Sequence, residues 1–119
     1  MSVPVLLVAV FFLGMGVYAL VLPARVLSFF GVDVTTVDGR NEVRAVYGGF
    51  GVAIGVLLLA AAGGMPSLRS GVLLCVAIAL LGMAAGRVAA ALLDGRPGFF
   101  PALFGAVEVA MAVVLLAGV

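Results

Sequence analysis

The chain has 119 residues, of which 66% are hydrophobic and only 9% are charged, and its mean hydropathy is +1.46. This composition lies far outside the range of soluble globular domains, and so small a soluble domain could not hide that much apolar surface from water. We therefore expect one integral membrane domain. The net charge of +1 argues against nucleic-acid binding, which requires a clustered basic face.

Two residue types that carry common catalytic chemistry are nearly missing, since histidine is absent and cysteine occurs once. All six basic residues are arginine, and the lack of histidine excludes histidine acid–base catalysis and histidine metal ligation. The single cysteine, Cys75, cannot form an intrachain disulfide or a CxxC redox pair. We expect no cofactor, no metal and no catalytic set.

The first apolar stretch, residues 3–22, lacks a basic flank and is too long for the core of a signal peptide. We expect it to be retained as a membrane helix. A connection of about 19 residues follows it. Within this connection, residues 24–31 could form a short interfacial helix, with Leu27 and Phe30 toward lipid and Gly31 at its end, or an ordinary surface loop.

Three further stretches reach the length of about 20 apolar residues that a membrane span needs. They are residues 42–63, 70–93 and 100–118. Asn41 is placed to cap the first of these three, with residues 38–42 as turn and cap outside the membrane. Lipid cannot satisfy backbone polar groups, so helices are expected, and short connections make neighbouring helices antiparallel. The sequence thus predicts an all-α antiparallel four-helix bundle over residues 1–119.

Arginine is more numerous beside two of the three turns between the spans. Arg25, Arg40 and Arg96 flank the first and third turns, whereas Arg69 flanks the second. The positive-inside rule then predicts that the first and third turns are cytoplasmic and that both termini lie outside.

Every ionisable residue within a span lies near the first and third turns. Arg44 is about one turn into the second span. Arg87 lies seven residues before Asp94, about 10 Å deep, and Glu108 lies seven residues past Pro101, at nearly the same depth. Helical spacing places these residues and Tyr47 on inward faces. Charged groups at membrane depth face the bundle interior and pair. We therefore predict an Arg87–Glu108 ion pair in a ligand-binding pocket, with Arg44, Tyr47 and Asp94 around it.

Each of these residues also has a purely structural explanation. The arginines could extend toward lipid headgroups, Asp94 could lie in a solvated turn, and Glu108 could form an ion pair that only stabilises the bundle or stay neutral in a hydrogen bond. Five glycines have the spacing that permits close helix packing without any ligand. They are Gly48, Gly51, Gly55, Gly82 and Gly86.

Three features form a set that occurs together in a known family. They are RAVYGG (44–49) after an acidic residue, GR with DG eight residues later (86–87 and 94–95), and the lone glutamate of the fourth span. This set resembles the family called domain of unknown function 4345, small four-span bacterial membrane proteins similar to the DoxX-like group.

The resemblance covers the whole chain and implies a location in the bacterial cytoplasmic membrane. It also implies that the chain carries the family's recurrent polar positions at Arg44, Tyr47, Gly48, Gly49, Arg87, Asp94 and Glu108. It implies no function. The DoxX-like kinship hints at quinone-linked or thiol redox systems, but one cysteine and no histidine would leave that chemistry to a partner.

Three functions fit these residues. The first is binding or carrying a small amphiphile, such as a membrane lipid, quinone or isoprenoid, with its head on the predicted pocket residues. The second is a structural or accessory subunit, whose charges fix helix packing and whose glycine faces bind a second copy or a membrane-complex partner. The third, an acid–base enzyme using Glu108 or Asp94 with Tyr47, ranks last because no nucleophile, metal set or cofactor motif accompanies them.

Overall fold

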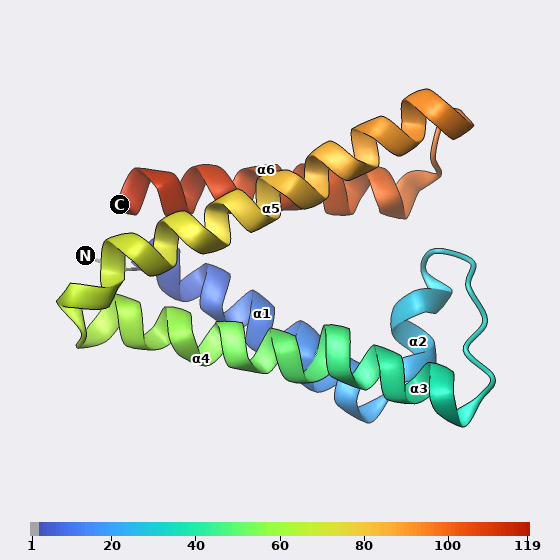
Figure 1. The fold of residues 1–119 in the computed structure, drawn as a ribbon, viewed down its shortest axis with the longest axis horizontal. Helices are drawn as coiled ribbons and strands as arrows, with labels where there is room; N and C mark the ends of the chain where they lie inside the picture. Colours follow the sequence, from blue (N-terminus) through green and yellow to red (C-terminus); the bar gives the residue numbers. More distant parts are fainter. Residues whose placement is uncertain (1–2) are drawn as a thin grey trace.

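The structure, a computed structural model, describes residues 3–119, and Figure 1 shows them as helices joined by short connections. The helices are α1 (Val3–Val21), α2 (Pro23–Ser28), α3 (Val37–Val43), the π-helical turn η1 (Arg44–Gly49), α4 (Phe50–Gly63), α5 (Pro66–Asp94) and α6 (Phe99–Gly118). Within this range, four helical segments are long and apolar enough to cross a membrane: α1, the continuous α3–η1–α4, α5 and α6. The protein is therefore an all-α, multi-pass membrane protein.

The second spanning helix begins earlier than the sequence predicts, at Val37 instead of residue 42. Thr36 caps it, because its hydroxyl oxygen accepts a hydrogen bond from the backbone N–H of Gly39 at 2.9 Å. Asn41 thus lies within the helix and is not its cap. The third spanning helix, α5, also begins earlier than predicted, at Pro66 instead of residue 70. Proline is tolerated there because an N–H in the first turn of a helix has no partner within the helix.

The connection after α1 contains a short helix, α2, and turns at Gly31, whose φ of +75° favours glycine. The two apolar residues of this connection that were expected to face lipid both pack against other parts of the protein. Leu27 packs against the cluster formed by Ala19, Val26 and Val43, and the ring of Phe30 lies 5.3 Å from that of Phe104 in α6. The reason is that the connection folds back over the ends of α1 and α3.

The spanning helices form two antiparallel hairpins, α1 with η1–α4 and α5 with α6 (Figure 1). Glycines bring the helices of the first hairpin into close contact. A Cβ at Gly16 would lie 2.6 Å from the backbone nitrogen of Val52, and one at Gly51 would lie 3.1 Å from the Cα of Gly16. Any side chain at these positions would push the two helices apart.

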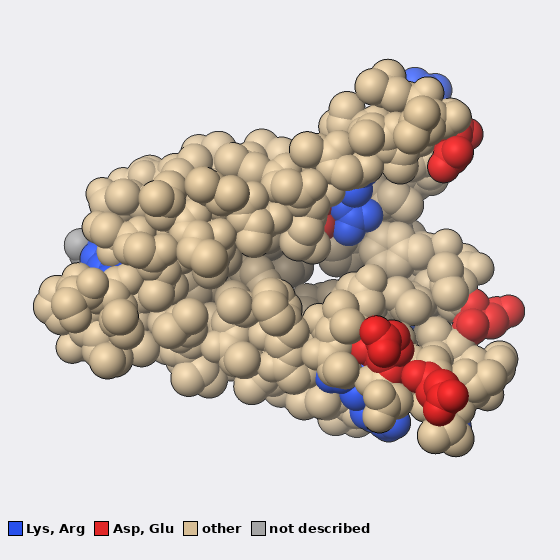
Figure 2. Space-filling view, viewed as in Figure 1, with Lys and Arg blue, Asp and Glu red and all other residues tan. Residues whose placement is uncertain are grey.

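The two hairpins share a hydrophobic core only toward the end that holds the C-terminus. That core consists of Val5, Val8, Ala9, Leu58, Leu73, Val76, Ala77, Leu80, Met111, Ala112 and Leu115. Toward the other end, a small cluster around Val26 contains no residue of α5 or α6. The hairpins diverge there, and Figure 2 shows the surface hollowed between the α5–α6 hairpin and the end formed by α2 and α3.

Candidate functional site

Arg87 of α5 and Glu108 of α6 form an ion pair in the half of the molecule where the hairpins diverge. Nε of Arg87 donates to Oε1 of Glu108 at 2.8 Å, and Nη2 donates to Oε2 at 2.9 Å. The side chain of Glu108 is 4% exposed, whereas that of Arg87 is 30% exposed. The carboxylate is therefore shielded, while the guanidinium keeps an accessible edge.

Two further residues hold Arg87 in this position. Gly105, three residues before Glu108, leaves room for its stem, since a Cβ at this glycine would lie 3.3 Å from Cδ of Arg87. The guanidinium carbon lies 5.7 Å from the ring centre of Phe30, a cation–π contact. The ring of Phe30 in turn packs on Phe104 of α6. The guanidinium thus contacts both α6 and the connection after α2.

An open groove of about 630 Å³ lies between α5 and α6 beside the ion pair. Its lining is mostly small and apolar: Ala84, Val88, Ala90, Ala91, Gly95, Pro97, Pro101, Ala102, Gly105, Ala106 and Val109, with Arg87, Asp94 and Arg96 as its charged members.

The α5 side of this groove continues the stripe that forms the core elsewhere. Ala77 and Leu80 are buried in the shared core, and Ala84, Val88 and Ala91 follow them at helical spacing along the same face. Val88 is nevertheless 61% exposed. This stretch of the stripe is therefore open, beside the exposed Ala102, Ala106 and Val109 of α6.

Arg44 contacts α1 and not Arg87. Its Nε donates to the backbone oxygen of Leu20 at 2.9 Å, near the C-terminus of α1, where a positive charge is favourable. The sequence-based stripe assumed a regular α-helix, but Arg44 lies in the wider π-helical turn η1, which changes the direction of its side chains. A Cβ at Gly48 would also meet Leu20, so Arg44 and Gly48 both face α1.

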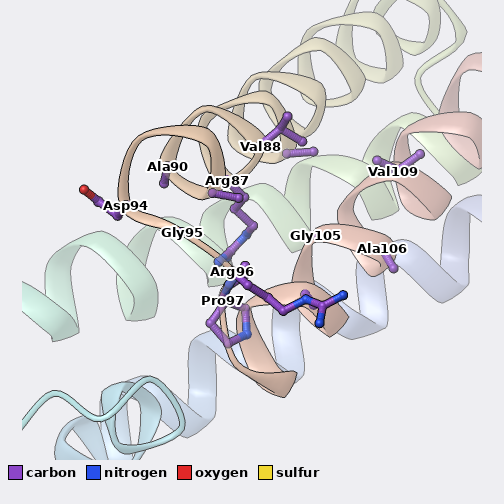
Figure 3. Close-up of a pocket in the computed structure, with 14 residues that line it drawn as sticks. Arg87, Val88, Ala90, Asp94, Gly95, Arg96, Pro97, Gly105, Ala106 and Val109 are labelled. Atoms are coloured by element: carbon purple, nitrogen blue, oxygen red, sulfur yellow. The ribbon is translucent and has the colours of Figure 1, made fainter.

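Tyr47 and Asp94 form no hydrogen bond with the ion pair. Tyr47 is 43% exposed and lines a second depression beside the connection after α2. Asp94 lines the groove, but Figure 3 shows its carboxylate pointing away from Arg87. No described residue pairs with Asp94.

Gly82 and Gly86 pack against no helix of this chain. No described atom lies within 4 Å of a Cβ built at either position, because the buried stripe of α5 passes through Ala77, Leu80 and Ala84 and leaves both glycines outside it. These two glycines therefore bring no helices of the chain together. Gly48, Gly51 and Gly55, in contrast, lie against α1.

Sequence reasoning gave no role in the site to Gly105, Phe30 or Arg96. Gly105 could have been found from its position one helical turn before Glu108. Phe30 could not, because its partners are remote in the sequence and the path of the connection decides the contact. Arg96 follows Asp94 in the turn, and Figure 3 shows its side chain extended toward the first turns of α6.

Comparison with known proteins identifies the family of this chain but no individual curated protein or solved structure that matches it. No curated protein and no solved structure matches the chain. The profile of one family, described as a domain of unknown function (DUF4345), matches residues 1–119. Since this match spans the whole chain, the protein belongs to the DUF4345 family of domains of unknown function.

Proposed function

We propose that this protein binds or carries a small amphiphile, such as a lipid, quinone or isoprenoid, with its head beside Arg87 and its tail along the α5–α6 groove. The observation that carries this proposal is an open, mostly apolar groove between α5 and α6 next to a paired charge. A volume of about 630 Å³ lies within the range of small-molecule sites. The apolar lining suits a hydrocarbon tail, and the guanidinium suits an oxygen acceptor.

The accessible edge of Arg87 supplies a physical reason for a ligand. Glu108 satisfies Nε and one N–H of Nη2, and no described residue accepts a hydrogen bond from Nη1. Charged groups within membrane-spanning segments usually pair with other polar groups. A polar head beside Arg87 would satisfy these donors without breaking its pair with Glu108. Arg44 is left out of this site, since it donates to Leu20.

Native mass spectrometry of the detergent-purified protein tests this proposal. Ala91→Phe fills the groove without changing any charge, whereas Ala79→Phe adds the same ring to an exposed position of α5 outside the groove. We expect the wild type and Ala79→Phe to retain a bound amphiphile and Ala91→Phe to lose it. Equal retention by the two variants would contradict the proposal.

The alternative is a structural or accessory subunit. Gly82 and Gly86 favour it, because their open positions and four-residue spacing would permit another helix to approach α5 closely. In that case, Gly82→Leu or Gly86→Leu would change the oligomeric state or the set of co-purified membrane proteins, and Ala91→Phe would change neither.

We further propose that the protein lies in a bacterial cytoplasmic membrane with both termini outside. Arg25, Arg40 and Arg96 lie near the first and third turns between spanning helices, and Arg69 lies near the second. This bias agrees with the positive-inside rule. The bacterial location rests on the kinship with DoxX-like proteins that the sequence suggests, which stays a prediction.

Labelling with a membrane-impermeant maleimide tests this orientation. In a Cys75→Ser background, Ser67→Cys lies near the second turn and Gly98→Cys near the third. In intact spheroplasts we expect labelling of Ser67→Cys alone, with Gly98→Cys labelled only after lysis. The reverse pattern would invert the topology.

A further inference from the structure

We propose that the head of the bound amphiphile is an oxyanion, a phosphate or a carboxylate, held by the outer edge of Arg87 and by Arg96 at the mouth of the groove. This inference rests on the proposed function and names the chemical class of the ligand's head. The contacts of the two arginines and the position of the carboxylates carry it.

Glu108 accepts hydrogen bonds from only some of the N–H groups of Arg87. A guanidinium has five N–H donors in a planar fork, and Glu108 takes one from Nε and one from Nη2. The remaining edge presents parallel N–H groups of Nη1 and Nη2. Such an edge matches two oxygens of a carboxylate or phosphate, whereas a single carbonyl oxygen would use only one of these donors.

The charges around the groove favour a negative head over a positive one. Glu108 is buried and already neutralised by Arg87. Arg96 lines the same groove and forms no ion pair with a described residue. Asp94 lines the groove, but its carboxylate points away from Arg87 (Figure 3). A cationic head would therefore meet two guanidinium groups and no inward-facing anion.

The polar groups also lie at the end of the groove that suits a lipid head. Arg96 and Pro97 lie in the turn between α5 and α6, whereas Ala84 and Val109 line the groove deeper in the membrane-spanning segments. Ala84 is ten residues from Asp94, about 15 Å along the helix. A head between the two arginines would thus place its tail toward the bilayer centre, as in a membrane lipid.

Two lipids with identical tails but different heads separate the contribution of the head to binding from that of the tail. The purified protein is incubated with dioleoyl phosphatidylglycerol or with dioleoylglycerol, which lacks the phosphate, and the bound fraction is read by native mass spectrometry. We expect the wild type to retain the phosphatidylglycerol roughly tenfold better, since a charge-assisted contact exceeds a neutral one. Inorganic phosphate, added as a competitor, tests whether a free oxyanion takes the same place.

Three variants identify the residues responsible. The double variant Arg87→Gln/Glu108→Gln removes both charges yet leaves side chains that can hydrogen-bond to each other, so we expect phosphatidylglycerol retention to fall toward that of dioleoylglycerol, with the remainder due to Arg96. Arg96→Gln, at an exposed position, should lower it several-fold without affecting folding. Arg25→Gln is the matched control, since it removes an exposed arginine from α2, outside the groove, and should change nothing.

The outcomes separate this inference from the proposed function. Equal retention of the two lipids by the wild type would overturn the oxyanion head and leave amphiphile binding intact. Retention of neither lipid would overturn both. An equal loss from Arg25→Gln and Arg96→Gln would also overturn the inference, because the effect would then be one of overall charge. Displacement of phosphatidylglycerol by inorganic phosphate would support the oxyanion site and identify the free anion as a competing source.

Discussion

Gly105 lies directly beneath the side chain of Arg87, so that a Cβ added to this glycine would stand 3.3 Å from Cδ of the arginine. The missing side chain lets Arg87 cross α6 and reach both oxygens of Glu108. The ion pair therefore depends on three residues, of which one contributes only space.

Substitution of Gly105 tests this dependence. Gly105→Ala should be tolerated, because the flexible stem of Arg87 can shift by a few tenths of an ångström. Gly105→Leu should displace the arginine and lower the free energy of unfolding by about 1–3 kcal/mol, the usual range for overpacking. Thermal unfolding in detergent, followed by circular dichroism, measures the change. Gly82→Leu is the control at an open position, and equal stability of the two leucine variants would refute the role of Gly105.

The contact between α1 and α4 predicts a strong effect at a different glycine. At Gly16, an added Cβ would meet the backbone nitrogen of Val52 at 2.6 Å and the backbone oxygen of Gly48 at 2.8 Å. Backbone atoms cannot move aside, so Gly16→Ala should destabilise the protein by at least about 1 kcal/mol. Gly86→Ala should instead be neutral or stabilise it by up to about 1 kcal/mol. Unfolding in a detergent–denaturant titration compares them, and similar midpoints would contradict the close packing.

The Arg87–Glu108 pair predicts strongly non-additive substitutions. Arg87→Gln or Glu108→Gln alone leaves a charged partner uncompensated, which for buried pairs costs about 3 kcal/mol or more. The double variant removes both charges and should lie closer to the wild type. A double-mutant cycle of unfolding free energies measures the coupling, and additive effects would show that the pair contributes nothing to stability.

Substitution of Arg44 tests whether this residue stabilises the end of α1 or binds the ligand. Because its Nε donates to the backbone oxygen of Leu20, Arg44→Gln should lower stability by less than about 1 kcal/mol, the scale of a charge at a helix C-terminus. It should leave the amount of retained amphiphile unchanged. A loss of bound amphiphile from Arg44→Gln with unchanged stability would restore Arg44 to the site.

Much of this architecture follows from local sequence properties. The four spans are visible in hydropathy and length, and the Arg87–Glu108 pair follows from depth and helical facing, because both residues lie in regular α-helices. The same reasoning failed for Arg44, since the π-helical turn η1 alters the direction of side chains, and nothing in RAVYGG distinguishes this turn from an α-helix.

Other features depend on contacts between distant segments. The position of Phe30 is decided by the path of residues 29–36, which folds back toward α6. Glycine spacing identified Gly51 and Gly82 alike, yet only the former lies against another helix of the chain. Spacing shows where close packing is possible, but the arrangement of the hairpins decides where it occurs.

A crystal structure of the protein grown in a lipidic mesophase would show directly whether an amphiphile occupies the groove. We predict elongated density in the groove between α5 and α6, with its head at Arg87 and its tail past Val88 toward Ala84. A groove closed over Val88 and Ala91 by other side chains, with no room for a ligand, would contradict it.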